Sequence, residues 1–217
     1  MGASGEDALM ETPRFDDTRR APMLTLSLGL LVLMLVAVMY PAVFDGPDSK
    51  ALRDLGLLVL PERAAVQPFA LVDQHGEEFG LAQLEGQWTL LFFGFASCPD
   101  VCPTTLAKLK KATAGLENAP RVVFVTVDPA RDSAELLGQY LEAFDSAFVG
   151  LRGSAFELDG FAAQFHVDYA VAPGVDGKYL MEHTAQVVVL DDQPRHVGFL
   201  MTPHRPEAIR AALQAVL

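Results

Sequence analysis

The chain has 217 residues, of which 51% are hydrophobic and 20% charged, and its formal net charge at pH 7 is −12. This length fits one domain with an extension, and the hydrophobic fraction is high for a purely soluble domain. The negative charge argues against nucleic acid as a partner, because such a surface repels phosphate backbones, whereas it would attract a cationic protein or a metal cation.

The first 44 residues divide into a charged tail and an apolar segment. Residues 21–44 contain no charged side chain and are rich in leucine, so they are long enough to cross a bilayer as a helix. We interpret residues 21–44 as a single transmembrane anchor and residues 1–20 as a cytoplasmic tail. A cleaved signal peptide is the alternative, but the apolar core is long for one and no clean small-x-small cleavage site follows it.

The charges beside the apolar segment predict its orientation. Three arginines precede it within residues 1–20, whereas two basic residues, Lys50 and Arg53, follow it, and this excess favours a cytoplasmic amino terminus. Residues 1–20 also carry five acidic residues, unlike an acid-poor mitochondrial transit peptide. The predicted location is therefore the cytoplasmic (inner) membrane of a bacterium, with one span and the carboxyl-terminal domain in the periplasm, where thiol pairs on tethered domains are well suited.

The apolar segment is followed by a predicted linker and then by the folded domain. Residues 45–67 are expected to be the linker, because they mix Gly, Pro and charged residues. A short apolar patch at 55–60 within the linker is expected to dock on the domain. Residues 68–217 are the predicted domain. It begins with a β-hairpin, in which an apolar run at 68–72 is followed by turn residues 73–76 and a second short strand.

Both cysteines of the chain lie at one predicted strand end. The apolar run at 89–95 predicts a buried central strand, and Cys98 and Cys102 follow it. Open α/β sheets commonly hold their functional sites at the carboxyl ends of strands, and Pro103 can open a helix there. Unpaired N–H groups and the dipole at a helix N-terminus favour thiolate over thiol. Because thiolate attacks disulfides and binds metals, the pair is expected to carry sulfur chemistry.

The rest of the domain is predicted to alternate between helices and strands. Helices are expected at 103–116, after a cap at Asp132 or Ser133, after a Ser-x-x-Glu capping box at 154–157, and at 206–217; strands are expected at 122–127, 185–190 and 196–200. This order is typical of a thioredoxin-like fold. The predicted fold class is therefore α/β, a thioredoxin-like domain with an amino-terminal β-hairpin extension, preceded by a single transmembrane helix.

The spacing of the cysteines widens the chemistry open to them. Three residues separate Cys98 from Cys102, so both sulfurs can lean toward one ligand, while a disulfide remains possible if the Cα atoms lie within about 7 Å. Two soft donors suit Cu(I), which readily takes a third ligand such as imidazole. Of the five histidines, His183 has the best position, because it precedes the strand at 185–190 and that loop lies beside the cysteine turn in a thioredoxin-like fold.

Three stretches resemble the signature segments of one known family. Residues 98–103 are Cys-Pro-Asp-Val-Cys-Pro, residues 127–132 are Val-Asp-Pro-Ala-Arg-Asp, and His183 is followed by Thr184. Together they resemble the Sco/SenC proteins, membrane-tethered copper-handling relatives of thioredoxin that help to assemble the CuA centre of cytochrome c oxidase. The resemblance extends from about residue 65 to the end of the chain, and the predicted single span is similar to the family's anchor.

The resemblance implies a site and a function. It implies that Cys98, Cys102 and His183 bind one copper ion, as Cu(I) or Cu(II), and that Asp128 and Arg131 support the site or face a partner without coordinating. It implies a copper chaperone that delivers copper to the CuA site of cytochrome c oxidase. The expected partners are the CuA-bearing subunit of the oxidase and other periplasmic copper chaperones or thiol reductants.

Two departures and two other functions have to be weighed against this interpretation. Glu182 stands where aspartate often precedes the ligand histidine and Ser133 where threonine is common, but both keep the charge or the hydroxyl.

An extracytoplasmic thiol-disulfide oxidoreductase that keeps CuA-site cysteines reduced is the alternative function, with Cys98 and Cys102 as its redox-active pair. A peroxidase is less favoured, because no Thr-x-x-Cys constellation is evident.

Four residues near the signature segments are expected to be structural. Asp132 is a candidate cap of the following helix, and Asp100 is expected to stabilise the cysteine turn. Met181 carries a soft sulfur but is expected to pack, and Trp88 is expected only to begin a strand. None of the four is predicted to bind the metal.

Overall fold

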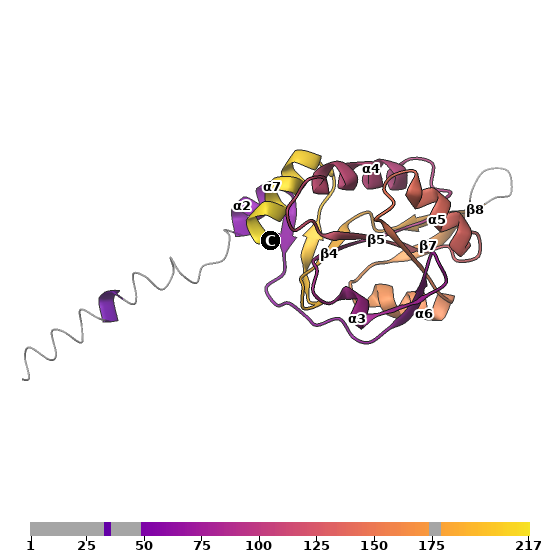
Figure 1. Ribbon diagram of the computed structural model, residues 1–217, viewed down its shortest axis with the longest axis horizontal. Helices are drawn as coiled ribbons and strands as arrows, with labels where there is room; N and C mark the ends of the chain where they lie inside the picture. The colour runs from indigo at the N-terminus through magenta and orange to yellow at the C-terminus, as the bar shows by residue number, and fades with distance from the viewer. Residues whose placement is uncertain (1–32, 36–48, 174–178) are drawn as a thin grey trace, which may run out of the picture. The chain divides into compact units, whose positions relative to one another are not determined.

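The computed structural model describes residues 33–35, 49–173 and 179–217. The folded domain is built on an eight-stranded mixed sheet with the strand order β1-β10-β9-β4-β5-β6-β2-β3 (Figure 1). Within it, β4 (Thr89–Gly94) pairs in parallel with β5 (Arg121–Thr126) and antiparallel with β9 (Val187–Leu190). The other strands of this sheet are β1 (Leu57–Val59), β2 (Ala70–Asp73), β3 (Glu78–Gly80), β6 (Val149–Arg152) and β10 (His196–Leu200).

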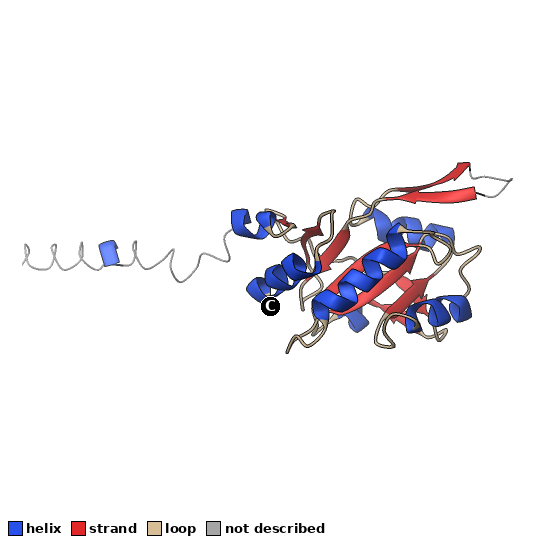
Figure 2. Ribbon diagram, turned by 90° about the horizontal axis from the view of Figure 1, so that it is seen from above, coloured by secondary structure: helices blue, strands red, loops and turns tan. Residues whose placement is uncertain are grey.

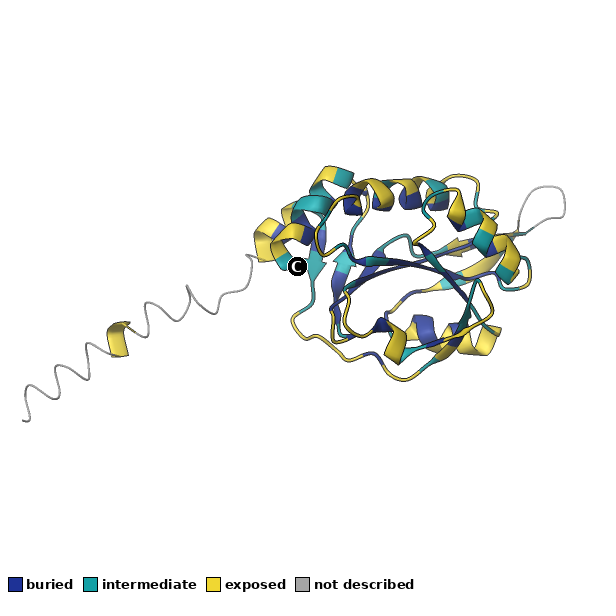
Figure 3. Ribbon diagram, viewed as in Figure 1, coloured by how far each residue is buried: buried dark blue, intermediate teal, exposed yellow. Residues whose placement is uncertain are grey.

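Helices cover both faces of the sheet (Figure 1). One face carries α4 (Val101–Thr113), α5 (Ala134–Glu142) and α7 (Pro206–Val216), and the other carries α3 (Leu81–Leu84) and α6 (Ala155–Ala163). The helices α4 and α5 each connect two parallel strands, and right-handed crossovers place both on the same face. Burial is concentrated in the central strands and on the inner sides of these helices (Figure 3).

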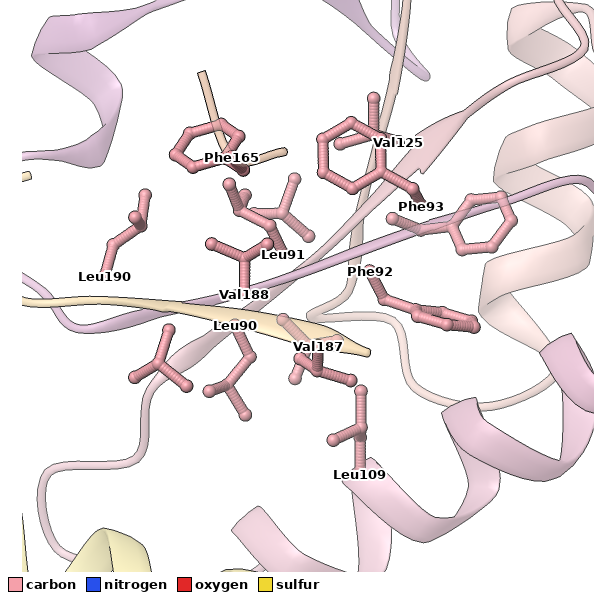
Figure 4. Close-up of a cluster of buried hydrophobic side chains, with 14 of the residues drawn as sticks. Leu90, Leu91, Phe92, Phe93, Leu109, Val125, Phe165, Val187, Val188 and Leu190 are labelled. Carbon is pink, nitrogen blue, oxygen red and sulfur yellow. The ribbon is translucent and has the colours of Figure 1, made fainter. Parts of the chain in front are cut away.

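The central strand β4 is buried along its whole length. Its side chains alternate between the two faces, so that Leu90 and Phe92 point toward Leu109 of α4 whereas Leu91 and Phe93 point toward Phe165 (Figure 4). Burying a large apolar side chain stabilises a fold by about 1.5 to 3 kcal/mol. Contacts on both sides therefore hold β4 firmly, and its carboxyl end is a well-fixed starting point for the cysteine segment.

A second, two-stranded sheet projects from the body of the domain (Figure 2). It is a hairpin of β7 (Tyr169–Pro173) and β8 (Tyr179–His183), paired antiparallel. At its base, the Thr184 N–H donates to the Asp168 carbonyl over 3.0 Å. Along it, Val171 and Leu180 are exposed apolar side chains, so the hairpin is attached to the rest of the domain by few packing contacts.

The α/β class, the central strand and the amino-terminal β-hairpin are confirmed. The hairpin is formed by β2 and β3, and β2 also pairs with β6, which joins the hairpin to the edge of the main sheet. The capping box at Ser154 and Glu157 is also present, at the start of α6. The strands β6, β7 and β8 were absent from the sequence-based prediction, and β9 begins at Val187 rather than at residue 185.

The cysteine helix begins two residues earlier than predicted. We expected it at Pro103, whereas α4 begins at Val101 with Asp100 as its N-cap residue. Proline is tolerated within the first turn of a helix, because the N–H groups there have no partner within the helix. As a result, Cys102 lies in the first turn of α4 instead of in the loop before it.

Part of the predicted linker belongs to the folded body. Residues 49–54 form α2 (Ser49–Asp54), and the apolar patch that was expected to dock forms β1, which pairs with β10 at one edge of the main sheet. The predicted tail at 1–20 and most of the predicted anchor at 21–44 lie outside the described residues. No helix within the described residues is both long enough and apolar enough to cross a membrane.

Gly94, the last residue of β4, leaves no room for a methyl group. A Cβ atom there would lie 2.8 Å from the Cys102 Sγ and 2.8 Å from a ring carbon of Phe124. We expect Gly94→Ala to lower the free energy of unfolding by about 1 to 3 kcal/mol, as measured by denaturant unfolding. Gly160→Ala is the control, because a Cβ on this helical residue would contact nothing within 4 Å. Unaltered stability of Gly94→Ala would show that α4 packs less tightly on β4 than described.

Candidate metal centre

The cysteine segment connects the end of β4 to the start of α4, and hydrogen bonds fix the backbone and the sulfur of Cys98. The Cys98 N–H donates to the Phe95 carbonyl over 3.1 Å. The Cys102 N–H, in the first turn of α4, donates to the Cys98 Sγ over 3.4 Å. Both cysteines are free thiols, Cys98 half-buried and Cys102 fully buried. The Cys98 sulfur thus satisfies one of the helix N–H groups that lack an intrahelical partner.

His183 reaches the cysteines from the opposite side of the site. It is the last residue of β8, and its Nε2 lies 3.5 Å from the Cys102 Sγ. The candidate ligand atoms of Cys98, Cys102 and His183 all lie within 4.8 Å of one another. The structure therefore brings together the three residues that the sequence singled out, although His183 ends a strand instead of lying in a loop.

The position of the His183 ring is fixed by one hydrogen bond and two aromatic rings. Its Nδ1 lies 3.0 Å from the Thr184 carbonyl oxygen, and because a carbonyl oxygen only accepts, Nδ1 carries the proton. The neutral ring then presents the lone pair of Nε2 toward Cys102, which is the form that binds a metal. The rings of Phe92 and Phe95 each lie 6.0 Å from the imidazole, centroid to centroid.

Burial reverses one expectation about the thiols. A helix N-terminus was expected to favour thiolate, but burial raises the pKa of the Cys102 thiol well above its ordinary value. The free energy needed to remove a thiolate from water is larger than the stabilisation that the partial charge at one helix end provides. Burial also lowers the pKa of His183. In the absence of a metal, Cys102 and His183 are therefore both neutral, and the expectation of a thiolate at Cys102 is wrong.

The donor set can hold one soft metal ion. Metal–sulfur bonds of about 2.3 Å and metal–nitrogen bonds of about 2.0 Å are typical of such ligands, and donor atoms within 4.8 Å of one another can share an ion after small side-chain movements. Two sulfurs and one imidazole favour soft or borderline ions, copper and zinc among them. A positive ion would also offset the cost of ionising a buried thiol.

The site opens to solvent through an apolar groove of about 290 Å³. Cys98 and His183 line it, together with the partly exposed side chains of Val101 and Leu180. The exposed carboxylate of Glu182 also lines the groove. A ligand from another molecule can therefore approach Cys98 directly, whereas Cys102 is shielded behind it.

The β5–α5 loop holds the start of the cysteine segment. Asp132, which is fully buried, accepts hydrogen bonds from the Ala96 N–H over 3.0 Å and from the Thr126 hydroxyl over 2.6 Å. The helix cap of α5 is Ser133, whose side chain accepts from the Leu136 N–H. Asp132 is thus not the cap of that helix. Instead, it connects the β5–α5 loop to the residue that follows Phe95.

The β5–α5 loop also contacts the β7–β8 hairpin. Arg131 forms an ion pair with the buried carboxylate of Asp128 and donates from Nη1 to the Tyr179 carbonyl over 3.0 Å. The Tyr179 hydroxyl donates to Asp128 Oδ1 over 2.9 Å. Asp128 and Arg131 thus do not reach the donor cluster themselves. Tyr179 was not singled out by the sequence, because nothing in its local pattern distinguishes it from other aromatic residues.

The residues expected to be structural have the following positions. Met181 is 9% exposed and belongs to the hydrophobic core, so its predicted packing role is confirmed. Asp100 accepts a hydrogen bond from the Thr104 hydroxyl over 3.3 Å, which agrees with a role in the cysteine turn. Trp88 precedes β4 and packs, partly buried, against the core.

Comparisons with known proteins identify the family. The SCO1/SenC family model matches residues 60–217. A Stutzerimonas stutzeri protein whose name refers to copper binding is 31% identical over 197 residues, which cover 89% of this chain and 96% of that protein.

Solved structures share the fold. Arabidopsis thaliana ScoI with copper bound is 30% identical and superposes with a TM-score of 0.66 over 69% of this chain and 96% of that one. Bradyrhizobium japonicum ScoI with copper bound is 34% identical and superposes with a TM-score of 0.63 over 71% of this chain and 100% of that one. These matches confirm the thioredoxin-like α/β fold, and with a family model that extends over most of the chain, they show that the chain belongs to the SCO1/SenC family.

Proposed function

We propose that this protein is a copper metallochaperone that binds copper through Cys98, Cys102 and His183 and delivers it to the CuA site of cytochrome c oxidase during assembly. The observation that carries the proposal is the convergence of two free thiols and one imidazole, with their ligand atoms within 4.8 Å of one another. These donors come from segments more than 80 positions apart in the sequence, and the fold brings them into one site.

The choice of copper rests on the donors and on the relatives. Two thiolates and one imidazole suit Cu(I), and the same ligands can hold Cu(II). The Arabidopsis thaliana and Bradyrhizobium japonicum ScoI structures, at 30% and 34% identity, both have copper bound. Since Cys98, Cys102 and His183 form a cluster in this chain, we assign them as the copper ligands.

The open groove supports transfer rather than permanent storage of the metal. Cys98 and His183 line a cavity of about 290 Å³ that is open to solvent. A partner's ligands can therefore enter the copper coordination sphere one at a time while the protein ligands leave. The net charge of −12 favours encounter with copper ions or cationic partner surfaces. The proposed recipient is the CuA-bearing subunit, and other periplasmic copper chaperones or thiol reductants would supply copper or electrons.

A thiol-disulfide oxidoreductase remains the second candidate, because the thiols differ in access. Cys98 is half-buried in the groove and accepts the Cys102 N–H, whereas Cys102 is fully buried. This arrangement suits an attacking thiol and a resolving thiol. In one cycle, the two thiols would become a disulfide, and two electrons and two protons would reduce a disulfide of the partner. An external dithiol reductant would then restore both thiols.

We also propose that residues 21–44 anchor the protein in the cytoplasmic membrane with the domain in the periplasm. Support comes from the uncharged, leucine-rich composition of this segment. Copper transfer to a membrane-bound oxidase would gain from such tethering, because an anchored domain has a high effective concentration near its partner.

The role of His183 as a copper ligand can be tested by titration. Anaerobic titration with Cu(I) against a competing chelator should show affinity at least about tenfold lower for His183→Ala than for the unaltered protein, since even changes to outer-shell residues commonly cost 10- to 100-fold. His75→Ala is the control, because His75 is an exposed turn residue between β2 and β3. Equal Cu(I) affinities for the unaltered protein and His183→Ala would remove His183 from the site.

A second experiment separates metal delivery from thiol reduction. In cells that lack the native protein, oxidase activity and CuA content should be lost with both Cys98→Ser and His183→Ala, because copper delivery needs sulfur and nitrogen ligands. Thiol exchange needs the sulfurs alone. Recovery of CuA by His183→Ala, with continued failure of Cys98→Ser, would favour the reductase over the chaperone.

The anchor can be tested by fractionation. We expect the full chain to stay with membranes after washing with high salt and alkaline carbonate, because about 20 apolar residues bury enough surface for stable insertion. Deletion of residues 1–44 should release the domain into the soluble fraction. External protease should digest the domain of the full chain in spheroplasts. Release of the full chain by salt alone would contradict a transmembrane anchor.

A further inference from the structure

The hairpin that carries His183 depends on a small number of attachments. A two-stranded hairpin is only marginally stable by itself, and Leu180 of β8 is 43% exposed and Val171 of β7 is 67% exposed. At the base, the hydrogen bond from the Thr184 N–H to the Asp168 carbonyl joins the two arms of the hairpin to each other. The hairpin is attached to the domain by the buried side chain of Met181 and by the Tyr169 hydroxyl of β7, which donates to Asp159 of α6. Neither contact lies at the Tyr179 end of β8, so an attachment there is needed to fix the direction of the strand, and hence of His183.

Arg131 supplies that attachment at the far end of β8. Its Nη1 donates to the Tyr179 carbonyl over 3.0 Å, and its guanidinium carbon lies 3.9 Å from the centroid of the Tyr179 ring. Asp128 pairs with Arg131 and accepts the Tyr179 hydroxyl. Tyr179 is thus held through its carbonyl, its ring and its hydroxyl, by two side chains of a loop that follows a buried strand.

Arg131 also contacts the wall of the donor cluster. Its guanidinium carbon lies 5.8 Å from the centroid of Phe95, and the Phe95 ring meets the His183 imidazole at 6.0 Å and 89°. Because the guanidinium group lies near both aromatic rings, it connects the strand that carries the imidazole with the ring that supports it. Cation–π contacts of this kind contribute most where the cation is partly desolvated, and the Arg131 side chain is 32% exposed.

We propose that Arg131, together with Asp128 and Tyr179, is a positioning residue that holds His183 against the cysteines and so sets how fast copper is released. This inference rests on the proposed function. Arg131 does not bind the metal; it acts through Tyr179 and Phe95. Without Arg131 the Tyr179 end of β8 is released, so the strand can twist about its own axis and His183 at its other end turns with it. The imidazole then leaves the copper site more often.

The test compares two arginines that are matched in structure. Arg195 pairs with buried Asp191 as Arg131 pairs with buried Asp128, with side-chain exposures of 39% and 32% for the two arginines. Asp191 follows β9, at the opposite end of that strand from His183. Arg131→Ala and Arg195→Ala therefore lose the same charge and one ion pair each, but only Arg131→Ala releases the hairpin. Because Asp191 also pairs with Arg63 over 3.4 Å, Arg63→Ala/Arg195→Ala is the second control, in which the buried Asp191 loses both arginines.

The variants are compared both with copper bound and without it. With Cu(I) bound, transfer to a chelator should be about tenfold faster for Arg131→Ala and less than twofold faster for Arg195→Ala. Tyr179→Phe keeps the ring and the carbonyl but loses the bond to Asp128, so its rate should fall between those of the unaltered protein and Arg131→Ala. With Cu(II), the sulfur-to-copper charge-transfer band should shift in Arg131→Ala and not in Arg195→Ala. In the metal-free protein, amide hydrogen exchange should accelerate within 179–183 for Arg131→Ala, to a smaller extent for Tyr179→Phe, and not for Arg195→Ala.

The outcomes separate this inference from the proposed function. Copper release and amide exchange at unaltered rates in folded Arg131→Ala would overturn the positioning role, and so would equal effects of the two arginine variants. If Arg131→Ala does not fold, Tyr179→Phe decides the question by the same two readouts. Failure of the unaltered protein to bind Cu(I) would overturn the proposed function, whereas faster exchange in metal-free Arg131→Ala would still show that Arg131 holds the hairpin.

Discussion

The pairing of β4 with β5 on one side and β9 on the other is the constraint on which the site depends. The cysteine segment leaves the carboxyl end of β4, the Asp128–Asp132 loop leaves the same end of β5, and the chain from His183 enters antiparallel β9 at that end as well. Three segments distant in sequence therefore meet at one edge of the sheet. Since β4 is buried on both faces, a shift in its register would carry Cys98 away from His183, and the core itself thus preserves the donor geometry.

The sequence predicts those parts of the molecule that local chemistry determines. The run at 89–95, the Ser154 capping box and the cysteine spacing each have a direct physical meaning, and each agrees with the structure. The β7–β8 hairpin was missed because its strands do not alternate cleanly between apolar and polar residues, and Val171 and Leu180 remain exposed. The sequence left the cap of α5 open between Asp132 and Ser133, and the structure selects Ser133. The partners of Asp132, Ala96 and Thr126, are known only once β4 and β5 are paired. Tertiary contacts therefore determine the role of a buried polar residue such as Asp132, whereas the local sequence pattern is enough to predict the main strands.

Burial also explains how the site can be stable without metal and still bind a cation. The raised pKa of Cys102 and the lowered pKa of His183 both come chiefly from desolvation. The metal-free pocket thus avoids isolated charges next to Phe92 and Phe95, which would be costly in an apolar environment. When a soft cation enters, the thiol proton leaves and the new negative charge is paired at once. The same burial that opposes ionisation in the empty pocket strengthens the attraction between metal and thiolate once both are present.

The three donors are held by different sets of contacts, and this difference supports the proposed transfer of copper to a partner. Cys102 is fixed in the first turn of α4, against Gly94 of the central strand. Cys98 lies in the open groove, and His183 ends a peripheral hairpin that contacts the β5–α5 loop through Tyr179. A ligand set held entirely by the core would bind tightly but would exchange slowly. In the proposed transfer, the imidazole would be the first protein ligand to leave, because β8 is held at its far end by the contacts of Tyr179 with Arg131 and Asp128. The sulfurs would keep the ion until a partner's ligands replace them.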